Sequence, residues 1–169
     1  MLKVAVIMGS DSDLPTLTPG IDLLASLHIP FEVRVISAHR TPDAAHAFSR
    51  GAIAAGFGAL ICAAGKAAHL AGVMASGTTL PVIGVPVKSS ELDGMDALLS
   101  TVQMPQGMPV ASVAINGAYN AALLAAQMIA LSDEALAKRL VQLREEMTRK
   151  VMAKDVAIMA QYKQHQEAH

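Results

Sequence analysis

The stretch VAVIMGSDSD, at Val4–Asp13, decides the fold. Its first half, Val4–Met8, is apolar at every position and has the length of one strand, and Gly9 then opens a polar loop. A strand without polar positions is usually covered on both faces, which is typical of a parallel sheet between two layers of helices. Ligands of such sheets bind beyond the carboxyl ends of the strands. The loop that starts at Gly9 is therefore the first candidate for a binding site.

The same alternation of short apolar runs and longer helical patterns continues along the chain. Further strands are expected at Phe31–Ile36, Ala59–Ala63, Val82–Val85 and Ser112–Ile115. Helices are expected at Leu14–Leu27, from Pro42 (after an N-cap at Thr41) towards a stop at Gly56, at Ala67–Ser76, at Asp96–Thr101 and at Tyr119–Leu131. The last of these is apolar nearly all round, so we expect it to be fully buried. The pattern predicts an α/β fold, a three-layer αβα sandwich with a doubly wound, flavodoxin-like parallel sheet.

A long C-terminal helix is predicted over residues 133–160, with Ser132 as its N-cap. Apolar side chains recur along it at three- and four-residue spacing, at Leu136, Leu140, Leu143, Met147 and Val151. Such a stripe is typical of a helix that packs on its own domain or on a neighbouring subunit. The 169 residues suffice for one domain, which we expect to span 1–169 with its core at residues 3–131.

The composition favours an oligomer. Hydrophobic residues make up 53% of the chain and charged residues 16%, against about 25% charged in an average soluble domain. A membrane protein is the alternative, but the uncharged stretch 97–132 is interrupted by proline, glycine and amide residues, and no signal peptide is expected. The net charge of −1 and the 3% of aromatic residues do not suggest binding to nucleic acid. Cys62, the one cysteine, is expected to be a buried reduced thiol, and we expect a cytoplasmic protein.

The first polar loop joins Gly9, Ser10, Ser12 and Asp13. Glycine permits a sharp turn, and the serine hydroxyls and the free N–H groups of a helix start can hold an anion. Because a carboxylate would repel phosphate, Asp13 fits better as an acceptor for the hydroxyl groups of a ribose. The alternative is that Ser12 or Asp13 only caps the following helix.

Two further loops carry cations and histidines. Ser37–Pro42 holds His39 and Arg40, and arginine binds phosphate through two parallel bonds whereas histidine transfers protons near neutral pH. Ala64–Gly72 holds Lys66 and His69 among small residues. A solvent-exposed turn is the alternative for the former loop; for the latter it is a buried structural histidine and a lysine in solvent.

The loops at 86–94 and 102–107 are candidates to close over a ligand, or are ordinary turns. No metal site is expected, because His39, His46 and His69 show no metal-ligand spacing, and no nucleophile elbow is present.

Six ordered stretches are distinctive: MGSDSD at Met8–Asp13, SAHRTP at Ser37–Pro42, AAHL at Ala67–Leu70, PVIGVPV at Pro81–Val87, STVQMPQGMPV at Ser100–Val110 and NAALLAAQ at Asn120–Gln127. Together they resemble the N5-carboxyaminoimidazole ribonucleotide mutase family, the bacterial and fungal class of phosphoribosylaminoimidazole carboxylase catalytic subunits. The resemblance covers residues 3–150. It implies a single catalytic domain of three-layer α/β fold that assembles as an octamer.

The resemblance also implies an activity and a site. The family moves a carboxylate from the exocyclic nitrogen of N5-carboxyaminoimidazole ribonucleotide to ring carbon C4 in de novo purine biosynthesis, without metal, ATP or organic cofactor. By position, His39 resembles the general acid/base, and Ser37 and Arg40 the phosphate contacts. The other expected substrate contacts are Ser10, Asp13 (on ribose hydroxyls), Gly9, Ser12, Gly65, Lys66, His69 and Leu70.

The third loop departs from the family pattern. The family sequence usually reads AGAGGAAHLPG, and here Ala63, Lys66 and Ala71 replace glycine, glycine and proline. The lysine either holds the carboxylate of the substrate or faces solvent. The related animal-type enzymes, which take free CO2, usually lack the AAHL stretch, so Ala67–Leu70 favours the mutase. Direct carboxylation by CO2 and a non-catalytic nucleotide-binding module remain as alternatives.

Overall fold

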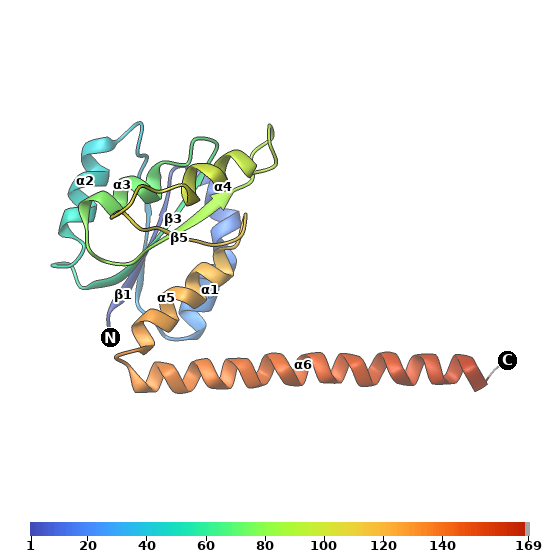
Figure 1. The fold of residues 1–169 in the computed structure, drawn as a ribbon. Coiled ribbons are helices and arrows are strands. Elements are labelled where there is room, and N and C mark those ends of the chain that lie inside the picture. Colours follow the sequence, from blue (N-terminus) through green and yellow to red (C-terminus); the bar gives the residue numbers. More distant parts are fainter. Residues whose placement is uncertain (168–169) are drawn as a thin grey trace.

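The computed structural model describes residues 1–167, so the last two residues of the predicted domain lie outside it. Figure 1 shows a sheet with helices on both faces and one long helix that extends away from them. The sheet consists of parallel strands in the order β2-β1-β3-β4-β5, the flavodoxin-like order that the sequence predicted. The strands are β1 (Lys3–Met8), β2 (Phe31–Val35), β3 (Phe57–Gly65), β4 (Val82–Val87) and β5 (Ala111–Ser112).

The helices form two layers because successive strand residues point to opposite faces. In β1, Val4, Val6 and Met8 lie in the core under α1 and α5, whereas Ala5 and Ile7 lie in the core under α2 and α3. This explains why the strand is apolar at every position. The helices are α1 (Leu14–Ser26, after a 3-10 turn at Asp11–Asp13), α2 (Pro42–Gly51), α3 (Leu70–Gly77), α4 (Met95–Val102), α5 (Ala118–Ala130) and α6 (Glu134–Glu167).

Several predicted boundaries were wrong. The last strand comprises Ala111–Ser112 alone, and the chain turns further on at Asn116, whose φ is +59°. The second helix stops at Gly51, and Gly56, with φ +81°, ends the turn that follows it. The long helix is capped by Asp133 rather than Ser132, since an oxygen of the Asp133 carboxylate accepts the backbone N–H of Leu136 at 2.9 Å.

The prediction that the helix at 119–131 is fully buried was also wrong. Its alanines pack so closely on α1 that a Cβ on Gly20 would lie 2.5 Å from the carbonyl oxygen of Ala118. On its other side, however, Asn120 and Gln127 are exposed, and Leu131 just beyond it is 91% exposed. A helix on one face of a sheet has a second side, which its own chain leaves uncovered here.

Most of α6 extends away from the body of the chain. Leu136 is fully buried in the core, and Leu140 and Leu143 pack against it. Figure 1 shows the remainder of the 34-residue helix running far past the sheet. Its exposed apolar side chains include Met147, Val151, Met152, Val156, Ile158, Met159 and Tyr162. No helix in residues 1–167 has both the length and the apolar content that crossing a membrane would require.

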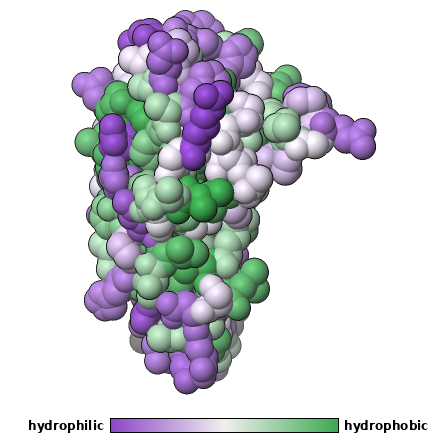
Figure 2. Space-filling view, turned by 90° about the vertical axis from the view of Figure 1, so that its left-hand side faces the viewer, coloured by the Kyte–Doolittle hydropathy of each residue, from purple (hydrophilic) through white to green (hydrophobic). Residues whose placement is uncertain are grey.

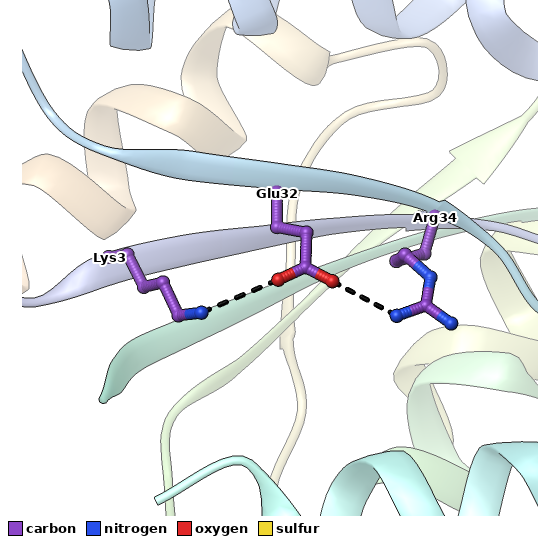
Figure 3. A network of polar contacts seen from close by, with 3 residues as sticks. All are labelled: Lys3, Glu32 and Arg34. Atoms are coloured by element: carbon purple, nitrogen blue, oxygen red, sulfur yellow. Dashed lines mark hydrogen bonds and ion pairs between the residues drawn. The ribbon is translucent and has the colours of Figure 1, made fainter. Parts of the chain in front are cut away.

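The edge strand β2 carries charged groups that protect it. In Figure 3, the Glu32 carboxylate lies between the Lys3 ammonium, at 3.4 Å, and the Arg34 guanidinium, at 3.0 Å. These cations, Arg34 before Lys3, lower the pKa of Glu32 below its usual range. Charges on an edge strand discourage pairing with a strand of another molecule.

Candidate active site

The carboxyl ends of the first four strands surround a pocket of about 490 Å³. The carboxyl ends of the strands lie at the top of the molecule in Figure 1, and Figure 2 shows hydrophilic side chains predominating there, with hydrophobic ones gathered lower on the same side. All the predicted site residues line this one pocket: Gly9, Ser10, Ser12, Asp13, Ser37, His39, Arg40, Gly65, Lys66, His69 and Leu70. Parallel strands deliver their following loops to one edge, so residues as far apart as Gly9 and Ser89, 80 positions along the chain, meet there.

The first loop is organised by Ser10. Its hydroxyl oxygen accepts the backbone N–H of Ser12 at 3.4 Å and lies 2.9 Å from the Ser12 hydroxyl, so Ser10, rather than Ser12 or Asp13, caps the 3-10 turn. Asp13 makes no side-chain capping bond to α1. Burial raises the pKa of the Asp13 carboxyl, with a smaller contribution from the nearby Asp11, against a backbone hydrogen bond at Ser10. A half-buried acceptor is thus held at the pocket wall.

The second loop is a rigid turn that aims Arg40. The Thr41 hydroxyl accepts the backbone N–H of Ser37 and donates to its carbonyl oxygen, both at 3.0 Å, instead of capping α2. The Ser37 hydroxyl accepts from the backbone and Nε of Arg40, at 3.2 and 3.4 Å. An Nη2 hydrogen of Arg40 goes to the Gly9 carbonyl at 2.8 Å. The guanidinium is therefore fixed between the first two loops, with further N–H groups for an anion.

His39 and His69 are in direct contact. Nε2 of His39 lies 2.7 Å from Nδ1 of His69, and the rings meet edge to face with centroids 4.9 Å apart. Two nitrogens at this distance share one hydrogen, since one must donate and the other accept. The contact uses Nε2 of His39 and Nδ1 of His69, and the ring nitrogens outside it are Nδ1 of His39 and Nε2 of His69. Both side chains are exposed, so the structure excludes a buried structural histidine at position 69.

The third loop carries Lys66 in a left-handed conformation, with φ +54°. Its Nζ lies 2.9 Å from an oxygen of Glu91, in the segment between β4 and α4. That segment also brings Lys88 and Ser89 to the pocket wall. The sequence marked loop 86–94 as a candidate to close over a ligand, but Lys88 and Ser89 were not among the predicted substrate contacts. The signal was present, because both residues follow a strand directly. Within residues 1–167, no cluster of three or more histidine, cysteine or acidic side chains has metal-binding geometry.

Cys62 lies in β3 and is fully buried as a free thiol, as predicted. Burial raises the pKa of this thiol far above its ordinary value. It has no access to the pocket and does not line it. We assign it to the core.

The chain is similar to known proteins over most of its length. The family model described as AIR carboxylase matches residues 3–150. The chain is 51% identical over 156 residues to the N5-carboxyaminoimidazole ribonucleotide mutase of Mycobacterium tuberculosis strain H37Rv, covering 92% of this chain and 90% of the relative. It is 55% identical over 152 residues to the enzyme of the same name from Brucella melitensis, covering 89% and 94%.

A solved structure shows the same fold. The crystal structure of Treponema denticola PurE superimposes with a TM-score of 0.82 at 28% sequence identity, covering 90% of this chain and 95% of that one. The similarity therefore extends over the sheet, both helical layers and part of the long helix.

Proposed function

The chain belongs to the AIR carboxylase family, and from that premise we propose the reaction and the roles of its residues. It is an isomerase of purine biosynthesis that moves the carboxylate of N5-carboxyaminoimidazole ribonucleotide from the exocyclic nitrogen to ring carbon C4. The product is 4-carboxy-5-aminoimidazole ribonucleotide. The observation that carries the mechanism is the 2.7 Å contact between His39 and His69 in the same pocket as Arg40.

Substrate binding follows from the charges of the pocket. The fixed guanidinium of Arg40 and the hydroxyl of Ser37 hold the 5′-phosphate, because arginine pairs with phosphate oxygens through several donors. The partly buried carboxylate of Asp13 has already lost part of its hydration. It accepts hydrogen bonds from the ribose hydroxyls, and these take the place of the lost water. These contacts place the base near the histidine pair.

The reaction moves one proton in each direction. The N–CO2 bond of the carbamate breaks, its electron pair stays on nitrogen, and a proton is added there to give CO2 and the free amine. C4 then attacks the carbon of CO2 and loses its own proton. His39 and His69 supply the first proton and recover the second, and their shared hydrogen lets a proton enter at the second nitrogen of one ring and leave at the second nitrogen of the other.

An absorbance assay tests this function. N5-carboxyaminoimidazole ribonucleotide should be converted to the C4-carboxylated product without added bicarbonate. Turnover of unmodified aminoimidazole ribonucleotide with bicarbonate, and none of the N-carboxylated compound, would instead indicate direct carboxylation. Binding without any turnover would indicate a nucleotide-binding module. Conversion should also survive exhaustive chelation, since no metal takes part in the proposed steps.

The proposal includes a cytoplasmic homo-oligomer, an octamer by family resemblance. Its support in this chain is the exposed apolar surface of α6 and of Leu131. Apolar patches of this extent usually mark contact surfaces between subunits. Native mass spectrometry at micromolar concentration should show an assembly larger than a dimer; a single monomer peak would contradict it.

A further inference from the structure

Lys66 has an unfavourable backbone conformation at the edge of the pocket. Its φ of +54° lies in the left-handed region, which a long side chain rarely adopts. Such residues persist where the surrounding structure holds them, and they concentrate at functional sites. Glycine would adopt this conformation without strain. A lysine at a position that favours glycine therefore indicates a role for its side chain.

The Lys66 ammonium reaches across to another loop. It pairs with Glu91 at 2.9 Å, and the two side chains are 67% and 56% exposed. Glu91 lies in the segment Lys88–Gly94, which protrudes between β4 and α4 in Figure 1. The other cation of that segment, Lys88, pairs at 2.9 Å with Asp93 of the same segment. Only the former pair joins two different loops around the pocket.

We propose that the Lys66–Glu91 ion pair is a latch, which draws segment 88–94 towards the loop after β3 and retains CO2 in the pocket during the reaction. The inference rests on the proposed function. Lys66 and Glu91 are positioning residues in this role, since they act through the closure of the loop. Lys88 and Ser89 of the same segment line the pocket, so movement of the segment opens its wall.

The chemistry explains why closure matters. CO2 is small and uncharged, so no charged side chain binds it strongly once the N–C bond has broken. Only the walls of the site keep it beside C4 until the new bond forms. If it escapes, the amine keeps its added proton and leaves as aminoimidazole ribonucleotide, and one proton is consumed from solution for each escape. The ratio of this side product to C4-carboxylated product measures the leak.

The test compares the leak in matched variants at saturating substrate. Glu91→Gln should raise the leak ratio by up to about fivefold, the scale of an exposed ion pair. Lys66→Gly, which also relieves the left-handed backbone, should raise it by the same factor. The double variant should leak no more than either single one, because both remove one interaction.

Asp93→Asn is the control. It breaks a pair of equal length inside the segment, and asparagine tolerates the φ of +52° at that position. Its leak should equal that of the wild type. Salt gives a second control, since about 1 M salt shortens the screening length to about 3 Å. It should raise the wild-type leak to the level of Glu91→Gln and leave that variant unchanged.

Two results would overturn the latch. One is a Glu91→Gln leak equal to wild type while Lys66→Gly alone leaks, which would mean that Lys66 holds the substrate directly. The other is unchanged hydrogen exchange of amides 89–92 in both variants without substrate, where the latch predicts faster exchange. Because the exchange experiment needs no turnover, it judges the latch even if the wild type converts nothing and the proposed function fails.

Discussion

Two hollows of similar size lie at opposite edges of the sheet. The pocket at the carboxyl edge, about 490 Å³, is lined by Asp13, two histidines, Arg40 and two lysines. The hollow at the amino edge, about 590 Å³, lies among the turns before β4 and β5, and Arg50 is the one charged residue in its wall. Volume alone would favour the second hollow. Side-chain chemistry, rather than size, therefore identifies the site.

The direction of the chain explains this difference. At the carboxyl edge each strand gives way to a helix start, whose free N–H groups favour anions. At the amino edge helices end, at Gly51 for α2 and Gly77 for α3, and the wall there consists mainly of glycine, threonine, proline and apolar residues. Only one edge is therefore suited to a phosphorylated substrate.

The largest expected effect is the loss of the histidine pair. His39→Asn keeps a polar side chain but cannot titrate near neutral pH, so turnover should fall by about a hundredfold or more while substrate binding stays nearly normal. His69→Asn breaks the shared hydrogen bond and should also reduce turnover. His46→Asn, on the exposed side of α2 and outside both hollows, should change neither. Calorimetry measures binding and absorbance measures turnover; normal turnover in His39→Asn would refute the assignment.

The two arginines test the two hollows directly. Arg40→Ala should weaken substrate binding by roughly ten- to a hundredfold, because it removes a charge-assisted bond to phosphate worth about 1.5–3 kcal/mol. Arg50→Ala removes the corresponding charge from the amino-edge hollow and should leave affinity unchanged. Titration calorimetry with the product would measure the affinity of each variant. Equal losses in both variants would mean that the comparison of the hollows is wrong.

Asp13→Asn should weaken substrate binding less than Arg40→Ala does, and it should stabilise the fold at pH 7. Binding should weaken by about three- to tenfold, since a neutral amide is a poorer acceptor for ribose hydroxyls. Burial raises the pKa of Asp13 above its ordinary 3.8, so the stability that its protonated form provides is present below pH 3.8 and is lost as the pH rises through the folded value. At pH 7 the ionised carboxylate destabilises the fold. The variant should therefore melt at a higher temperature at pH 7, and an unchanged or lower Tm would contradict this.

The smallest effect is expected at Glu32, which lies away from both hollows. Its pKa is lowered below the ordinary 4.5, so its stabilising contribution is present above pH 4.5 and is lost as the pH falls through the folded value. Glu32→Gln should lower Tm slightly at pH 7 and not at all once wild-type Glu32 is protonated. Substrate affinity should not change. A Tm difference that persists at low pH would exclude the ion pairs as its cause.

Much of the fold was predictable because apolar runs and polar loops alternate so regularly. The gathering of Asp13, Arg40 and His69 follows from parallel strands ending at one edge. The contact between His39 and His69 was not predictable, since it depends on side-chain conformations 30 residues apart. The sequence also does not reveal that Lys66 reaches Glu91. The full burial predicted for α5 failed because apolar composition does not say whether a chain covers itself or needs another copy.

The position of α6 in the chain has a consequence for biosynthesis. The helix follows the body, and among its described side chains Leu136 is the one fully buried in the core. At about 5–20 residues per second, the ribosome needs about 2–7 s to make these residues. The body thus has seconds in which to fold before the exposed apolar side chains of α6 have all been made.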